Sequence, residues 1–584
     1  MTTAYERLSL EGFYAELPAT DAQSARAQVV QSLAAIGYAV EDRGDRVAIV
    51  GAVPFDAGRF GVEIDPGGGE PIGIAQAWTI AHALAARLGP EALVEPMFEG
   101  DVELEQVSEL GREESFGGGE PTPPDDVRWH LVPSRVAEAH AWLRAHHLGI
   151  GHGVVIGHPD TGYTRHPEIW REHGGPLDLR EGTNFLEAGP PEDPRTHGLL
   201  LQPEHGTATA SLIVAIDGTA VPRNPGEAPS VDLLGVAPEV RVVPIRVTTS
   251  VVVLGWQSRL ARAIERAVDL DCDVISISLG GLGGRRLERA VEYAEKHGVI
   301  VVAAAGNQVG FVVAPATHPL VVACAATGPD DRPWPGSSHG RAVDISAPGG
   351  SVWVAGWKDQ VPIARGGSGT SFATATVAAA AALWRSAHAE ELASWSPSAV
   401  PGAFRAALKK SARNVNLPRG FGAGLLDCAS LVEAPLAAGL MEASPVVPER
   451  GALTRASLDS LLGAEDRSEA TVAAGVAPEL DVALASELAL HLTLDPELRS
   501  RLRASGLPTP QLLSRASPRL RKELRKELTR DGNRSAARPP PAPGVTAPLA
   551  PLPARSDIRR DDDGAITIRI ELDIVVRVEA EFDD

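Results

Sequence analysis

The first hundred residues alternate apolar and polar positions in a way that predicts a small α/β unit. A strand is expected over Phe13–Leu17, and Thr20 or Asp21 is expected to cap a helix that runs to Ile36. The elements expected next are two strands, a helix and a last strand, over Tyr38–Asp42, Arg46–Val53, Ile74–Leu88 and Ala92–Phe98. This βαββαβ order predicts a ferredoxin-like α+β domain over residues 1–105.

Residues 128–435 repeat a different pattern, in which apolar runs alternate with amphipathic segments. The apolar runs predict strands of a parallel sheet that is covered on both faces, at Gly153–Ile156, Val240–Val247, Val274–Leu279, Val299–Ala304 and Leu320–Ala325. Helices are expected over Ser258–Leu270, Arg286–His297 and Thr370–His388. The alternation predicts a doubly wound α/β domain with a mostly parallel sheet.

The remaining segments differ in composition from these two domains. Residues 106–127 are rich in Gly and Pro and lack periodicity, which predicts a linker, and residues 436–535 favour a helical region. Residues 536–556 are rich in Pro and Ala and predict a second linker. In residues 557–584 every even position from 566 to 582 is apolar, which predicts an amphipathic β tail. The tail is expected either to complete the sheet of residues 1–100 or to bind a protein partner by strand addition.

Charge and cysteine content narrow the classes of partner. The formal net charge of −22 argues against nucleic acid or an anionic membrane surface as partner. No apolar run reaches the length of a membrane span, and the first residues lack a secretory signal pattern. The three cysteines are far apart and odd in number, which fits a reducing compartment without disulfides. A cytoplasmic location is therefore expected.

Four polar residues of the α/β domain stand where strands end or helices begin: Asp160, His205, Asn307 and Ser371. Acyl transfer by serine needs a base for the hydroxyl proton, a carboxylate that orients the base, and donors that meet the oxyanion. Each residue alone also has an ordinary structural explanation, such as a turn Asp or a capping His. The set in the chain order Asp, His, Ser is much more specific.

Short motifs around these residues resemble the subtilase family of serine peptidases. Seven segments carry the resemblance, in family order: Asp160-Thr161-Gly162, His205-Gly206-Thr207, Gly235-Val236-Ala237-Pro238, Ser276-Ile277-Ser278-Leu279-Gly280-Gly281, Ala305-Gly306-Asn307, Ala347-Pro348-Gly349 and Gly369-Thr370-Ser371-Phe372-Ala373. The resemblance implies a subtilisin-like serine endopeptidase with Asp160, His205 and Ser371 as catalytic triad and Asn307 in the oxyanion hole. Protein or peptide substrates follow from that activity.

The resemblance also implies a substrate-binding groove. The positions it gives to the groove and its S1 pocket are Ser278, Leu279, Gly280, Ala304, Gly306 and Val313. None of them is acidic, so an apolar P1 residue is expected rather than Lys or Arg. Subtilases often bind structural calcium, but the chain has no compact Asp-rich loop of EF-hand type, so no metal or other cofactor is assigned.

Departures from the family pattern put the substrate preference in doubt. Ala208 and Ala375 replace a usual His and Pro, and His158-Pro159 precedes the Asp where apolar residues are commoner. Two alternatives to a simple peptidase stay open, a dead peptide-binding module and a regulated signalling or interaction protein. By resemblance, residues 1–105 form an inhibitory propeptide that is cleaved, or else a docking module that stays attached.

Overall fold

The computed structural model divides into two units, Met1–Thr529 and Arg530–Asp584, which are described separately. It describes residues 8–37, 47–52, 58–65, 72–99, 123–171, 174–195, 202–253, 257–436, 448–463, 480–505, 508–526, 557–560, 566–570 and 574–578. The predicted linkers therefore lie outside the described residues, except for residues 123–127. That short stretch packs on the following domain, where the Trp353 indole N–H donates to the Pro124 carbonyl at 2.8 Å.

The N-terminal domain has the βαββαβ order and the strand order β2-β3-β1-β4 of a ferredoxin-like unit. Its elements are β1 (Ser9–Pro18), α1 (Ala22–Ala35), β2 (Val47–Ala52), β3 (Arg59–Ile64), α2 (Ile74–Leu88) and β4 (Leu93–Glu99). Asp21 caps α1 by accepting from the Ser24 backbone N–H at 2.7 Å. All three strand pairings are antiparallel.

One strand of this domain differs from the sequence prediction. The expected strand Tyr38–Asp42 lies outside the described residues, and the partner of β2 is β3 at Arg59–Ile64. Phe60, Val62 and Ile64 alternate with polar residues and Gly61 there, so a period of two is present in the sequence. The pattern was missed because the run is short and the sequence on both sides of it is rich in Pro and Gly, which is typical of turns.

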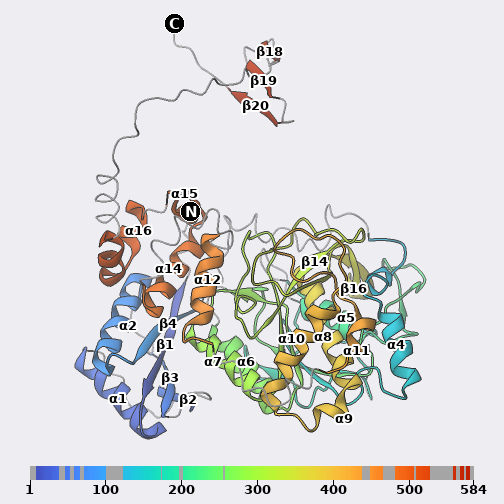
Figure 1. Cartoon of the computed structure of the whole chain (residues 1–584), viewed down its shortest axis with the longest axis horizontal. Helices are drawn as coiled ribbons and strands as arrows, with labels where there is room; N and C mark the ends of the chain where they lie inside the picture. Colours follow the sequence, from blue (N-terminus) through green and yellow to red (C-terminus); the bar gives the residue numbers. More distant parts are fainter. Residues whose placement is uncertain are drawn as a thin grey trace. The chain divides into compact units, whose positions relative to one another are not determined.

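The peptidase-like domain is built on a parallel sheet with the order β15-β14-β13-β11-β5-β9-β6. Figure 1 shows this domain, with β14 and α8 labelled. The strands are β5 (Val155–Asp160), β6 (Thr183–Asn184), β9 (Arg241–Arg246), β11 (Val274–Ile277), β13 (Ile300–Ala304), β14 (Val322–Thr327) and β15 (Ile345–Pro348). The sequence predicted five of these strands. The very short β6 and the strand β15 escaped prediction, and β5 extends beyond the predicted end at Ile156 to include Asp160.

Helices cover both faces of this sheet, as expected for a doubly wound domain. They are η2 (Trp129–Leu131), α4 (Val136–Ala145), α5 (His205–Val214), α6 (Gln257–Asp269), α7 (Arg285–Lys296), α8 (Thr370–Ala387), α9 (Ala389–Leu392), η3 (Pro397–Ala399), α10 (Val400–Ser411) and α11 (Cys428–Glu433). Three short strand pairs complete the domain: β7 (Ala220–Val221) with β8 (Val231–Asp232), β10 (Val252–Val253) with β12 (Gly280–Gly281), and β16 (Val352–Lys358) with β17 (Val361–Gly367).

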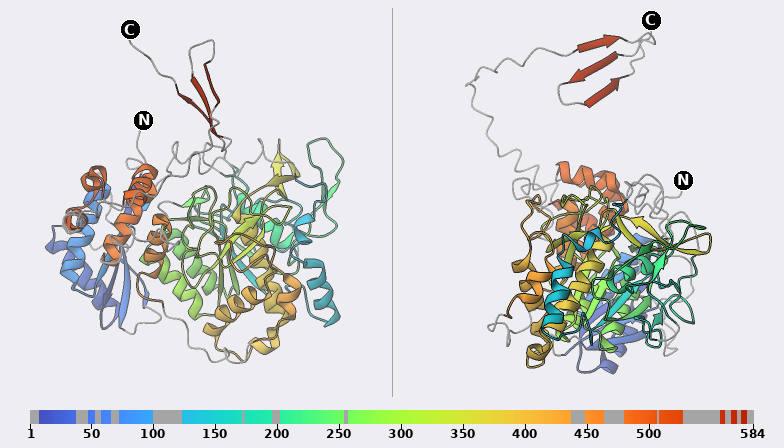
Figure 2. Two further views of the ribbon diagram at one scale, coloured as in Figure 1. Left: turned by 45° about the horizontal axis from the view of Figure 1, so that its top comes forward. Right: turned by 90° about the vertical axis from the view of Figure 1, so that its right-hand side faces the viewer.

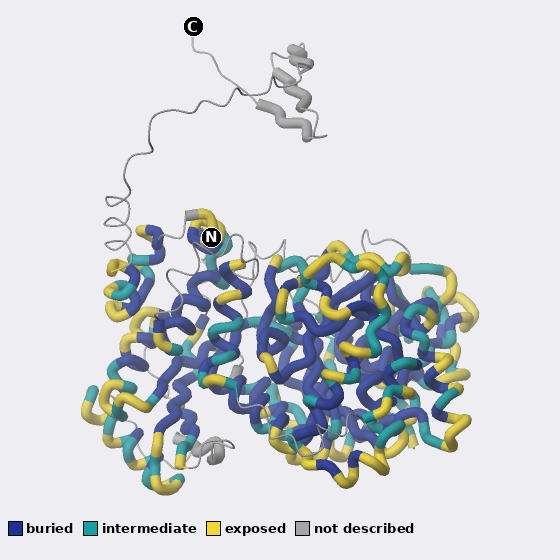
Figure 3. Tube along the Cα trace, viewed as in Figure 1, coloured by how far each residue is buried: buried dark blue, intermediate teal, exposed yellow. Residues whose placement is uncertain are grey.

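Strand β13 shows why the apolar runs are continuous. Its residues Ile300 and Val302 belong to the core on the side of α5 and α8, whereas Val301 and Ala303 belong to the core on the side of α6 and α7. Successive side chains of a strand point to opposite faces, so a sheet buried on both faces needs apolar residues at every position. Figure 3 shows this buried interior in dark blue.

The helical region follows and forms a core of its own. Its helices are α12 (Ala452–Leu462), α14 (Val482–Leu494), α15 (Pro496–Ser505) and α16 (Pro510–Arg515), with residues 518–526 also helical. Their leucines pack together and against Phe311 and Val313 of the peptidase-like domain. Figure 2 shows the N-terminal domain (blue) beside these helices (orange) and beside α6 and α7 (green).

The second unit contains three short antiparallel strands, β18 (Asp557–Arg560), β19 (Ile566–Ile570) and β20 (Ile574–Val578). The predicted β structure of the tail is present as a hairpin, β19–β20, extended by β18. These strands pair with one another in a sheet of their own, and the expectation that the tail completes the sheet of residues 1–100 stays a prediction.

Candidate active site

Asp160 and His205 meet at the carboxyl edge of the parallel sheet. Asp160 is the last residue of β5, and His205 is the first residue of α5. The Nδ1 atom of His205 lies 2.8 Å from Oδ1 of Asp160, and the Thr161 backbone N–H donates to the same oxygen at 2.7 Å. Both side chains are fully buried, so their contact is shielded from water.

The charge of Asp160 is set by opposing effects. Burial alone would raise the pKa of Asp160, but His205, His158 and the Thr161 N–H together hold that pKa below its ordinary value. The carboxylate is therefore ionised at neutral pH. A fixed anion at Nδ1 orients the imidazole ring and stabilises the imidazolium that a general base becomes.

Ser371 stands in the first turn of α8, after a glycine-rich approach. Its hydroxyl donates to the Ser278 carbonyl at 3.2 Å, and the Ser278 hydroxyl donates back to the Ser371 carbonyl at 3.0 Å. The ring centroids of His205 and the neighbouring Phe372 are 6.5 Å apart, which brings the start of α8 to the His205 side of the sheet. The start of a helix favours the negative charge that develops there during acyl transfer.

Asn307 is held beside this helix start by its amide oxygen. That oxygen accepts from the Thr370 backbone N–H at 2.9 Å and from the Thr370 hydroxyl at 2.8 Å. The Gly306 backbone N–H donates to the same hydroxyl at 3.1 Å. Because the amide is planar, its Nδ2 group lies on the side away from these donors, as an oxyanion donor requires.

The predicted groove residues also come together, around Val313. A Cβ atom on Gly280 would lie 2.2 Å from one Val313 methyl, and a Cβ on Gly306 would lie 3.1 Å from the other. Gly280 belongs to β12, which pairs with β10, and the groove positions Leu279 and Ala304 are both buried. Glycine at position 280 is thus required by the close approach of Val313.

The loop that contains Val313 packs against α12, and the sequence did not predict this contact. The Val312 backbone N–H donates to the Ser460 hydroxyl at 2.9 Å, and the hydroxyls of Thr317 and Ser457 are 3.0 Å apart. Nothing in the local sequence points to this support, because the helix lies more than a hundred residues further along the chain.

A second histidine lies under the Asp160 carboxylate. Nε2 of His158 is 3.0 Å from the Thr209 hydroxyl and 3.8 Å from Oδ2 of Asp160, and the same hydroxyl lies 3.4 Å from Oδ2. Burial lowers the pKa of His158, although the Asp160 charge opposes the change, so the ring is neutral. Two sequence spacings could have predicted this contact. His158 and Asp160 are two residues apart and so share one face of their strand, and Thr209 lies one helical turn after His205.

Within the residues that the structure describes, no cluster of three or more His, Cys, Asp or Glu is arranged to hold a metal ion. The helices of the same described segments are also too short or too polar to cross a bilayer.

Comparison with known proteins places this site in a family. The model described as the subtilase family matches residues 151–424. Subtilisin Savinase from Lederbergia lenta is 31% identical over 288 residues, which cover 48% of this chain and 92% of that protein. Subtilisin E from Bacillus subtilis (strain 168) is 32% identical over 252 residues, which cover 41% of this chain and 57% of that protein.

A solved structure supports the fold. The crystal structure of fervidolysin from Fervidobacterium pennivorans matches with a TM-score of 0.50 and 20% identity, over 74% of this chain and 62% of that one. The segment that the family model matches contains Asp160, His205 and Ser371, and the sequence relatives lead to the same assignment. The chain belongs to the subtilase family and is a subtilisin-like serine peptidase.

Proposed function

We propose that Asp160, His205 and Ser371 are the catalytic triad with which this serine endopeptidase cleaves protein chains. The contact that carries the proposal is the 2.8 Å approach of His205 Nδ1 to a buried Asp160 carboxylate, near the first turn of α8, which contains Ser371. With Nδ1 held by Asp160, Nε2 is the ring atom that remains for the serine hydroxyl.

The geometry supports the following sequence of steps. His205 takes the hydroxyl proton as the Ser371 oxygen forms a bond to the substrate carbonyl carbon. The oxyanion is met by the Asn307 amide and by backbone N–H groups at the start of α8. The C–N bond then breaks, the amine leaves with the proton from His205, and water repeats the cycle to release the acid.

The groove residues support a preference for apolar P1 side chains. Gly280, Gly306 and Val313 lie together, and none of the six proposed groove positions carries a charge. A Lys or Arg at P1 would lose its hydration without gaining an ion-pair partner. Chromogenic peptides that are identical at P2–P4 and end in Leu, Phe or Ala should be cleaved faster than those ending in Lys or Arg. Faster cleavage after Arg would contradict this pocket.

The triad itself is tested by two serine variants in the same helix. Ser371→Ala should abolish cleavage of an unfolded protein substrate, whereas Ser386→Ala, at the far end of α8, should retain it. Ser386 serves as the matched control because its hydroxyl donates to the His152 carbonyl at 3.4 Å, away from Asp160 and His205. Equal cleavage by Ser371→Ala and the parent would refute the assignment of the nucleophile.

A cytoplasmic location is a further proposal, supported by the cysteines. Cys272, Cys324 and Cys428 are buried and form no disulfide. Burial raises the pKa of the Cys272 thiol to about 12 and raises the pKa of the other two thiols as well, so all three are unreactive. Cell fractionation followed by immunodetection of the chain tests the location, and recovery outside the cytoplasm would contradict it.

We also propose that the β tail binds a protein partner by strand addition. The three strands form a sheet of their own, with β18 and β20 at its edges. An edge strand offers unpaired backbone groups to an incoming strand. Affinity capture with the full chain and with a Val576→Pro variant in β20 tests this proposal. Equal recovery of the same partner by both proteins would contradict β20 as the docking edge.

A further inference from the structure

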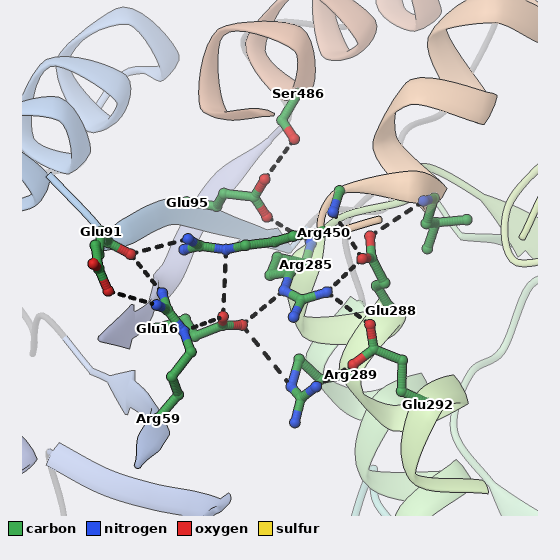
Figure 4. A network of polar contacts seen from close by, with 12 residues as sticks. Glu16, Arg59, Glu91, Glu95, Arg285, Glu288, Arg289, Glu292, Arg450 and Ser486 are labelled. Atoms are coloured by element: carbon green, nitrogen blue, oxygen red, sulfur yellow. Dashed lines mark hydrogen bonds and ion pairs between the residues drawn. The ribbon is translucent and has the colours of Figure 1, made fainter. Parts of the chain in front are cut away.

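One buried network of ion pairs joins three parts of the chain that are far apart in the sequence (Figure 4). At its centre is Glu16 of β1, a fully buried residue of the N-terminal domain. Arg285 of α7 donates to Glu16 at 2.7 Å, and Arg450, which precedes α12, lies 3.4 Å from it. Arg59 of β3 lies 3.2 Å from Glu16, and Arg289 of α7 lies 3.9 Å from it. Burial alone would raise the pKa of Glu16, but the arginines around it, with Arg285 foremost, hold that pKa below its ordinary value.

The start of α7 is capped by a residue of the N-terminal domain. Gly284, the residue before the helix, provides no side-chain cap, and the Arg285 backbone N–H instead donates to Glu95 of β4 at 2.7 Å. The other oxygen of Glu95 accepts from the Ser486 hydroxyl of α14 at 2.5 Å. A single carboxyl group therefore ties the N-terminal sheet to a helix of each of the other two parts.

The start of α12 is capped in turn by the peptidase-like domain. Gly451 also provides no side-chain cap, and Glu288 of α7 accepts from the Gly451 and Leu453 N–H groups at 2.8 and 3.2 Å. Glu288 pairs with Arg285 as well. Because both helix starts depend on carboxyl groups from another part, α7, α12 and the N-terminal sheet stabilise one another.

A second contact between the N-terminal domain and the helical region lies at Glu487 of α14. Its carboxylate accepts from the Ser517 backbone N–H at 2.6 Å and from the Ser517 hydroxyl at 2.8 Å. Nε2 of His82, on α2, lies 3.2 Å from the same carboxylate. This contact is therefore made by helix α2 of the N-terminal domain and does not involve α7.

Apolar packing follows the same arrangement. Leu282 of the peptidase-like domain and Ala483, Leu490 and Leu494 of α14 belong to the same buried cluster as the core of the N-terminal domain. Removal of that domain would expose these side chains to water. It would also take Glu16 from Arg285 and Glu63 from Arg286, and loss of an ion-pair partner is unfavourable for a buried charge.

We propose that the C-terminal helical region is a second docking surface for the N-terminal domain, which makes that domain a permanent part of the protein. A domain held by α7 alone could leave once its connection to the peptidase-like domain was cut. Here α12 and α14 hold it from another side, so it stays bound after such a cut. Of the two expectations for residues 1–105, this arrangement favours the attached module over the released inhibitor, and it does not depend on catalysis.

The test is to cut the connection and ask whether the pieces separate. A recognition site for a specific protease is inserted between residues 105 and 118 of the full chain, in the Ser371→Ala background to prevent self-cleavage. After complete cutting, size-exclusion chromatography and native mass spectrometry at low micromolar concentration should show both fragments in a single 1:1 complex. Elution of the N-terminal fragment by itself would overturn the proposal.

Substitutions then separate the two docking surfaces. In the cut protein, Glu487→Gln and Ser486→Ala weaken the contacts of the helical region with His82 and Glu95 and leave the ion pair between Arg285 of α7 and Glu16 in place. Together they should raise the dissociation constant of the fragment by about 10-fold or more. Glu138→Gln, on the exposed face of α4, is the matched control and should leave it unchanged. An unchanged dissociation constant in the double variant would show that the helical region is not a docking surface.

Discussion

The catalytic centre and the interdomain network are both clusters of buried charge, but they are built differently. At the centre, Asp160 has one close ionisable partner, His205, and a neutral His158 further away. In the network, Glu16 faces several arginines, which in turn contact other carboxyl groups (Figure 4). In the proposed mechanism, the sparse cluster lets His205 change its charge during the reaction. The crowded cluster holds the pKa of Glu16 below its ordinary value and joins the domains.

The first prediction tests this difference at the centre and has the largest expected effect. His205→Ala should reduce kcat on the order of 10⁶-fold, as loss of the base does in subtilisin, which is a relative of this chain. Its melting temperature should stay close to that of the parent, since His205 has no role in joining domains. Residual activity within tenfold of the parent would contradict the role of His205 as base.

The two clusters also differ in how far the sequence could predict them. Asp160, His205 and Ser371 each lie in a short sequence motif, so the residues next to each one were enough to predict it. Arg285, by contrast, belongs to a helix rich in both positive and negative side chains, a composition typical of a solvent-exposed surface. Its partners Glu95 and Glu16 are 190 and 269 residues away, and only the folded chain shows that this face is buried.

The same contrast explains the other differences from prediction. The strands of the parallel sheet were predictable because burial on both faces makes each a continuous apolar run. The strand β3 was missed because its run is short and lies between turn-forming residues. The support of Val312 by Ser460 could not be predicted, since it is a single hydroxyl contact between distant segments.

The second prediction concerns the network. Arg285→Ala should lower the free energy of unfolding by about 3–5 kcal/mol, because it removes the foremost ion-pair partner of the buried Glu16 and one of the partners of the buried Glu292. Arg180→Ala, whose side chain is 87% exposed, is the control and should change it by less than about 0.5 kcal/mol. Thermal and denaturant unfolding measure both. An equal, small effect of the two variants would contradict the structural role of the network.

The third prediction returns to the centre. Asn307→Leu should lower kcat by about 10²–10³-fold with little change in KM, because the oxyanion forms only in the transition state. Steady-state kinetics on a single good peptide measure the two constants. A rise in KM at constant kcat would show instead that Asn307 binds the substrate or shapes its loop.

The fourth prediction, the smallest, concerns acid. Burial would raise the pKa of Glu487, but hydrogen bonds from His491, His82 and Ser517 hold that pKa at about 2, against an ordinary value of 4.5. A carboxyl group whose pKa is lowered by folding stabilises the fold at pH values above its ordinary pKa. This contribution is lost as the pH falls toward the pKa of the group in the folded protein. Glu487→Gln should therefore melt below the parent at pH 6, and the gap should narrow between pH 4.5 and 2. A gap that is constant with pH would contradict this role of the carboxylate.

The central claim is that Ser371 is the activated nucleophile of a serine peptidase. Its most direct test is to treat the native full-length chain with a fluorophosphonate probe and to locate the adduct by peptide mass spectrometry. The account predicts one adduct, on Ser371, and a strong loss of labelling in His205→Ala, where the serine lacks its base. No adduct on the folded parent, or an adduct on another serine that persists in Ser371→Ala, would contradict it.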